Sequence, residues 1–269
     1  MHELDDDVHP YGGEKLVSDG SFLRRMPQVV PIKERMRLDA IVTAADIIEQ
    51  SFNVLRTVTA EIGTEIEKFG NIERAYIISQ CWTLVDQLHA IRQLLETAHK
   101  KEPRPFTKHF LEAALSATQL RNYMDHLAKN LPNLSNKKGS TLPLFGCLSY
   151  FYSVQKPPMI GHIVTIMSGV LHGDAMMPVI NPLGRNLTLP AGMFTLSASH
   201  YSLDFVRAIA TLRDWLGYVE GILEPDILGQ LVQQGISSSG IEAAMASTGG
   251  GLVIALRIDF SSDAGACDT

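Results

Sequence analysis

The chain has 269 residues, of which 45% are hydrophobic and 19% are charged, and its formal net charge is −6. This composition is sufficient for one large hydrophobic core or two small ones, and it excludes a chain that is disordered over most of its length. The negative charge excludes a protein that binds nucleic acid through its whole surface, but it is compatible with a local basic patch.

Cysteine usage and the N-terminal sequence indicate the compartment. The three cysteines are widely spaced and form no CxxC pair, so we predict neither a disulfide framework nor a zinc site. The N-terminus lacks the basic and apolar regions of a secretory signal, and no run approaches the roughly 20 apolar residues of a membrane helix. We therefore expect a cytoplasmic protein with no membrane segment, no metal and no other cofactor.

Apolar periodicity divides the first half of the chain into helices. Residues 1–31 are rich in aspartate and glycine, and they predict a flexible N-terminal arm. Beyond the arm, apolar residues recur at three- and four-residue intervals, which is the pattern of amphipathic and buried helices. The expected helices cover residues 32–66, 72–95 and 107–131, with Thr107 as the cap of the third, and together they predict an α-helical bundle.

The second half begins with a different pattern. Aromatic and β-prone residues cluster between turn signals over residues 140–198, and they predict a small antiparallel sheet inserted into the bundle. A long helix capped by Ser202 is expected next, with Asp204 near its N-terminus and a short helix after Pro225. The predicted fold is thus mainly α, a bundle over residues 32–234 with a small β-containing insert. Glycine and serine runs predict a flexible tail over 235–269, in which the apolar run 252–258 is unexplained.

One short motif carries candidate chemistry, the sequence RNYMDH at residues 121–126. In a helix, Asn122 and His126 lie on one face, whereas Arg121 and His126 are about 140° apart. Arginine offers a planar cationic fork to a phosphate, asparagine positions an oxygen, and histidine transfers protons near neutral pH. These groups suit an attack by a ribose 2′-hydroxyl on its own phosphate. Spacing alone favours a plainer interpretation, in which Arg121 and Asp125 form a surface ion pair and His126 is a helix-surface histidine or a satisfied core histidine.

A helical bundle whose late helix carries Arg-Asn-x-x-x-His resembles the HEPN superfamily (higher eukaryotes and prokaryotes nucleotide-binding domains). The segment WTLVDQLH at residues 82–89 is similar to the acidic-residue helix that packs beside this motif. The resemblance covers residues 32–131 and the helix from 203, and it implies a metal-independent ribonuclease with an active cleft formed across a homodimer, or an inactive relative that binds RNA. Arg121 would hold the scissile phosphate, Asn122 would position the substrate, and His126 would transfer protons.

Other residues are candidates for supporting roles. Asp86 would orient Arg121 or His126 from the neighbouring helix, or it is a surface carboxylate. A basic connector would contact an RNA backbone, or it is a solvated loop. Its residues are Lys100, Lys101, Arg104 and Lys108.

Two other functions remain open at this point. One is a non-catalytic protein–protein module in a stress or defence system, with an antitoxin or defence protein as its partner. The other is a small-molecule-binding protein whose site lies in the β-containing region.

Overall fold

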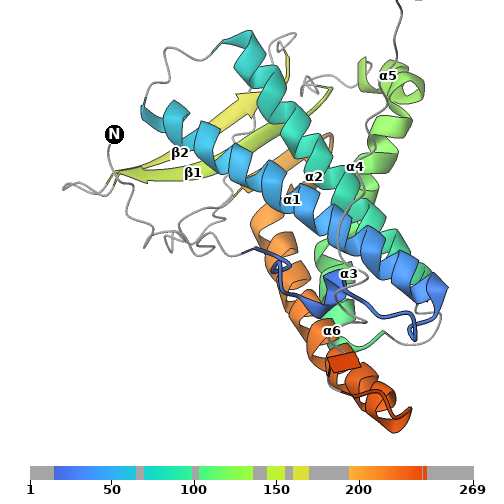
Figure 1. Ribbon diagram of the computed structural model, residues 1–269. Coiled ribbons are helices and arrows are strands. Elements are labelled where there is room, and N and C mark those ends of the chain that lie inside the picture. Colours follow the sequence, from blue (N-terminus) through green and yellow to red (C-terminus); the bar gives the residue numbers. More distant parts are fainter. Residues whose placement is uncertain are drawn as a thin grey trace, which may run out of the picture.

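The computed structural model describes residues 15–64, 70–98, 103–135, 144–154, 160–169, 194–237 and 239–240. Within these ranges, the predicted mainly α fold with a small β-containing insert is confirmed (Figure 1). The helical elements are η2 (Phe22–Arg24, a 3-10 helix), α1 (Ile32–Thr64), α2 (Asn71–Ala98), α3 (Pro105–Ala113), α4 (Leu115–Asp125), α5 (Leu127–Ser135) and α6 (Phe205–Gln233). The strands are β1 (Cys147–Val154), β2 (Ile160–Met167), β3 (Phe194–Ala198) and β4 (Tyr201–Asp204).

The two longest N-terminal helices, α1 and α2, run side by side and supply the centre of the core (Figure 1). Their apolar residues recur at three- and four-residue steps, so each helix has a continuous apolar face. That face would be exposed to water if the two helices did not pack together. Burying each large apolar side chain contributes roughly 1.5–3 kcal/mol, which makes this contact a major source of stability. Fully buried members include Ile41, Ile48 and Leu55 on α1 and Ile77, Leu84, Leu88 and Ile91 on α2.

The sheet has the strand order β2-β1-β3-β4 within the described residues, and its strands pair antiparallel. Tyr150 of β1 stacks on its cross-strand partner Phe194 of β3, at a centroid distance of 5.5 Å. Phe52 of α1 meets Phe194 edge-on, also at 5.5 Å, and the Tyr150 hydroxyl donates to the Thr59 carbonyl of α1. These aromatic contacts hold the sheet against α1. The connections over residues 155–159 and 170–193 lie outside the described residues.

The expected third helix is not continuous. It is divided at Ala114 and His126 into α3, α4 and α5, although neither position is glycine or proline. Ala114 is fully buried, so packing rather than local propensity sets this break. Thr107 also does not cap the segment, because α3 already begins at Pro105 and the buried Thr107 hydroxyl accepts a hydrogen bond from Trp215 of α6.

The last helix also differs from its prediction. Ser202 lies in β4, and the cap of α6 is instead Asp204, whose carboxylate accepts from the Arg207 amide at 3.1 Å. The helix then continues through Pro225 to Gln233 as one element rather than two. Proline removes one backbone donor and kinks a helix, but the buried residues Ile227 and Leu231 anchor the last turns to the core. Tertiary packing therefore outweighs the local helix-breaking signal.

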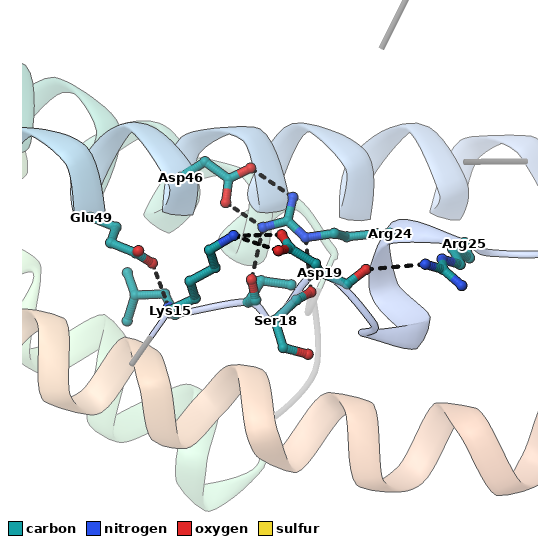
Figure 2. Close-up of polar contacts among 9 residues, drawn as sticks. Lys15, Ser18, Asp19, Arg24, Arg25, Asp46 and Glu49 are labelled. Atoms are coloured by element: carbon teal, nitrogen blue, oxygen red, sulfur yellow. Dashed lines mark hydrogen bonds and ion pairs between the residues drawn. The ribbon is translucent and has the colours of Figure 1, made fainter. Parts of the chain in front are cut away.

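The described part of the predicted N-terminal arm is packed rather than free. We call residues 15–31 the N-terminal strap, and Figure 2 shows part of its polar contacts with α1. Its backbone amides are held by two helices, because the Leu16 amide donates to Glu49 of α1 at 2.6 Å and the Phe22 amide donates to Glu220 of α6 at 3.0 Å. Buried apolar side chains of the strap add to the core: Leu16, Val17, Phe22, Leu23, Met26 and Val30.

Arg24 joins the strap to α1 through a bidentate ion pair. Its two terminal nitrogens lie 2.5 and 2.7 Å from the carboxylate oxygens of Asp46, and its guanidinium also donates to the carbonyls of Val17 and Ser18 (Figure 2). The hydrogen bonds to Asp46 raise the pKa of Arg24. The side chain is only 23% exposed, so solvent screens this pair less than an ordinary surface pair.

Replacing Arg24 should destabilise the fold more than replacing its neighbour. We expect Arg24→Met to lower the free energy of unfolding by about 1.5–3 kcal/mol, because it removes charge-assisted hydrogen bonds and leaves strap carbonyls without their donor. Arg25→Met is the matched control, since Arg25 is exposed and makes one long hydrogen bond of 3.5 Å, so its effect should stay within about 0.5 kcal/mol. Urea denaturation measures both, and equal effects would contradict the proposed clamp.

Two glycines should respond in opposite directions to alanine. Gly146 has φ +81°, and an added Cβ would lie 2.5 Å from the Ser197 carbonyl oxygen, so Gly146→Ala should lower the free energy of unfolding by roughly 2 kcal/mol or more. Gly221 lies inside α6 with nothing near its Cβ position, so Gly221→Ala should raise it by roughly 0.5–1 kcal/mol. Thermal unfolding of both variants tests the expectation, which fails if the two shifts have the same sign.

Candidate functional site

Polar side chains meet along the contact between α2 and α4, in a cluster that we call the α2–α4 seam: Asp86, His89 and Arg92 on α2, and Thr118 and Arg121 on α4. Asp86 contacts Arg121, and His89 contacts Thr118. From the first contact to the second, the residue on α2 moves forward by three positions, whereas its partner on α4 moves back by three. The two helices therefore run antiparallel here. Steps of three place each set on one side of its helix.

Arg121 is fixed by two carboxylates. Its Nε lies 3.2 Å from Asp86 Oδ1, and its Nη1 lies 3.1 Å from Asp125 Oδ1. The first contact is an ion pair without hydrogen-bond geometry, and that Asp86 oxygen is buried. The Arg121 side chain nevertheless remains 40% exposed, so part of the guanidinium faces solvent. Asp86 therefore lies beside Arg121, and Arg121 also forms an ion pair with Asp125.

The other two residues of the motif lie apart from these contacts. α4 ends at Asp125, and His126 is its C-cap, with its amide donating to the Asn122 carbonyl at 3.2 Å. The side chains of Asn122 and His126 are exposed. Among the described residues, no side-chain hydrogen bond or ion pair joins either of them to Arg121. A single chain thus presents the three groups on one end of α4 without assembling them.

His89 is the histidine beside Arg121 in this structure. Its Nδ1 lies 3.0 Å from the Thr118 hydroxyl oxygen, a hydrogen bond whose direction depends on the ring tautomer. Burial lowers the pKa of His89, and the positive charges of Arg121 and Arg92 lower it further, while Asp86 opposes them. The imidazole therefore stays neutral to a lower pH than an exposed histidine would.

Arg92 forms the far end of the seam. It pairs with Glu96 at 2.7 Å, donates to the Leu111 carbonyl at 3.2 Å, and donates to the Thr118 hydroxyl at 3.1 Å. Both seam arginines are thus neutralised by carboxylates. His89, Arg92 and Thr118 were not predicted as site residues, although polar residues at three-residue steps on an otherwise apolar helix are a recognisable signal.

An exposed apolar ledge lies next to the seam. Leu144 and Phe145 have exposed side chains, and Phe145 is 48% exposed. Their carbonyls accept hydrogen bonds from both seam helices, since the Trp82 indole of α2 donates to Phe145 at 3.0 Å and the Tyr123 hydroxyl of α4 donates to Leu144 at 3.1 Å. Trp82 is one helical turn from Asp86, so the ledge adjoins the Arg121 ion pairs.

The described residues of the predicted basic connector, Arg104 and Lys108, make their contacts away from the seam. Arg104 donates to the Tyr218 hydroxyl of α6 at 3.0 Å, Lys108 lies 4.0 Å from Glu112, and Lys100 and Lys101 lie outside the described residues. Arg104 precedes Arg121 by 17 positions along two successive helices, or about 25 Å at 1.5 Å per residue. The described basic residues therefore form a separate surface, towards the α3 end of this helical run (Figure 1).

Two cavities occur elsewhere. One of about 850 Å³ lies between the strap and α1, and another of about 610 Å³ lies beside α6; neither is lined by a seam residue. The described residues contain no group of three or more histidine, cysteine, aspartate or glutamate side chains arranged to hold a metal. Within the same ranges, no helix combines the length and apolarity that crossing a bilayer requires. The chain matches no protein-family model, no curated protein and no solved structure.

The lowered pKa of His89 predicts a pH dependence of stability. As pH falls, the unfolded chain, whose histidine has a pKa near the ordinary 6.5, takes up the proton before the folded chain does. The free energy of unfolding should therefore decrease from about pH 7 towards pH 5, and His89→Gln should flatten that decrease. The exposed His126→Gln serves as the control. Arg121→Met should raise the pKa of His89 in an NMR titration. Parallel stability curves for wild type and His89→Gln would contradict this assignment.

Proposed function

We propose that this chain binds single-stranded RNA on the surface around Arg121, as a HEPN-like protein. The observation that carries the proposal is the state of Arg121, which is held between two helices yet is 40% exposed. A fixed, exposed guanidinium suits a phosphate, and exposed Asn122 and His126 lie close by on the same helix end. The adjoining ledge of Leu144 and Phe145 offers a surface on which a base can stack.

Local charge sets a limit on this binding. Asp86 and Asp125 together outweigh the charge of Arg121, and the C-terminal end of a helix is itself electronegative. A phosphate must therefore compete with a carboxylate for the guanidinium. We infer weak, salt-sensitive binding that combines one phosphate contact with base stacking, rather than a tight phosphate site.

Cleavage, where it occurs, would follow from the same groups. The 2′-hydroxyl attacks the adjacent phosphorus, its proton passes to a base, the 5′-oxygen leaves with a proton, and a 2′,3′-cyclic phosphate results. His126 would transfer protons and Arg121 would stabilise the phosphate charge. Since one chain does not join these two side chains, we propose a homodimer in which two copies of the motif complete one cleft.

A second candidate is a non-catalytic protein–protein module, with an antitoxin or another defence protein as its partner. The two ion pairs of Arg121 support it, because they give that residue a structural role that needs no ligand. The exposed ledge also suits a protein partner. Substitution of Asp125 distinguishes the two functions. Losing this carboxylate should raise the affinity for RNA, whereas it gives no general increase in the affinity for a protein partner.

RNA affinity should respond to the sign of the charge that is removed. Arg121→Ala should weaken binding of a labelled single-stranded oligonucleotide by about tenfold or more, because a charge-assisted contact is lost. Asp125→Asn should strengthen it, and Phe145→Ser should weaken it. Lys129→Ala, an exposed lysine on α5, serves as the control. Fluorescence anisotropy at two salt concentrations gives the affinities. If Arg121→Ala and Asp125→Asn both bind like wild type, RNA does not use this surface.

Catalysis and assembly give a separate prediction. His126→Ala should lower the cleavage rate by about 10²–10⁴-fold and leave RNA binding nearly intact. EDTA should leave the rate unchanged, since the proposed reaction needs only proton transfer and charge stabilisation, and 2′-O-methyl RNA should resist cleavage. Light scattering should give about twice the monomer mass of 29.6 kDa. Cleavage that survives His126→Ala would overturn the assigned role, and a monomer mass at micromolar concentration would overturn the shared cleft.

A further inference from the structure

The cavity of about 610 Å³ is an apolar groove along α6, which we call the α6 groove. It is bounded by α6, the end of the N-terminal strap (Val29, Val30 and Pro31), the start of α1, the end of α2 and the start of α3. Its volume is in the range of pockets that hold ligands or a few apolar side chains. Four apolar lining residues, Leu38, Ile41, Leu95 and Trp215, form a floor that is already buried, whereas Val219, Ile222 and Leu223 of α6 are partly exposed beside it.

The polar groups of the groove are unevenly paired. Glu34 forms an ion pair with Arg37, and Arg104 donates to the Tyr218 hydroxyl. Asp226 is exposed, and it has no hydrogen bond or ion pair with any described residue. The groove therefore combines an apolar floor with one carboxylate that is available to a cation.

The chain reverses its direction at the end of α6. Gly235 has φ +77°, its amide donates to the Val232 carbonyl at 2.9 Å, and the Ile236 amide donates to the Leu231 carbonyl at 3.1 Å. This pair of hydrogen bonds is a Schellman motif, which ends a helix and reverses the chain. Ile236 packs against the core.

The sequence beyond this reversal contains a segment of matching chemistry. Residues 252–258 read LVIALRI, six apolar residues with one cation, Arg257. Eleven residues lie between Gly240 and Leu252, and the twelve steps from one to the other span up to about 40 Å in an extended chain. The α6 residues that line the groove, from Trp215 to Gln230, cover about 22 Å. The segment can therefore reach any part of the groove.

We propose that residues 252–258 dock in the α6 groove, with their apolar side chains against partly exposed Val219, Ile222 and Leu223 and with Arg257 paired with Asp226. Burial of apolar surface drives the docking, and the single ion pair sets its position. The C-terminal segment then covers one face of α6 next to the end of the N-terminal strap, which lines the same groove. This inference does not depend on the proposed RNA function, and it replaces the expected flexible tail for these seven residues.

Trypsin cleavage after Arg257 tests the docking in the full chain. Docking should make cleavage in the folded protein at least about tenfold slower than in a synthetic peptide of residues 250–264, because proteolysis follows the population of the open form. Ile254→Asp, in the segment, and Leu223→Glu, in the groove, should each restore the rate of the corresponding peptide. Val232→Glu is the control, since Val232 is 62% exposed on α6 and does not line the groove. Wild-type cleavage at the peptide rate would overturn the proposal.

A photo-crosslinking residue at position 223 identifies the occupant and does not depend on how Leu223→Glu folds. Mass spectrometry should find crosslinks to residues 252–258 within the same molecule, and the same group at position 232 should give none. Crosslinks only to another segment, only to a second copy, or only to a copurified small molecule would each overturn the proposal. Circular dichroism confirms that each variant keeps its helices.

Discussion

The apolar faces of α1 and α2 bury each other along most of their length, and the other elements occupy the faces that remain on this pair. The sheet covers α1 through Tyr150 and Phe194, and α4 lies against α2 along the seam. Each contact adds apolar area that the two helices alone could not bury, which is why a chain with two long apolar helices needs both a sheet and further helices.

The seam shows how such packing constrains chemistry. Arg121 takes its position from Asp86 on the neighbouring helix, and the same contact that fixes the guanidinium also neutralises it. His89, between two arginines and partly buried, is kept neutral by the surroundings that orient it. A ligand for this surface therefore meets groups that are well positioned but weakly charged, and it must supply binding energy from stacking or from a second copy of the chain.

The N-terminal strap and the proposed docked segment 252–258 have comparable roles, since each covers part of the helical core. The N-terminal strap has little regular structure, yet it is held by Glu49, Glu220 and Asp46 and buries six apolar side chains. Single carboxylates on long helices thus capture backbone amides of a segment that has little regular structure itself. The proposed docking of 252–258 extends the same arrangement to the other end, with the reversal at Gly235 directing the chain.

The sequence by itself determined the long helices α1 and α2 and the presence of the small sheet. Apolar periodicity and β-prone residues are local features of the sequence, and they indicate the type of element without knowledge of its tertiary contacts. It also identified Asp86 and Asp125 as candidate partners of Arg121, since both carboxylates occur in segments expected to be helical. Only the tertiary structure decided the break at buried Ala114, the continuity of α6 through Pro225 and the packing of the strap. Each of these depends on contacts between residues far apart in the chain, whose free energy exceeds the local preferences that a sequence pattern records.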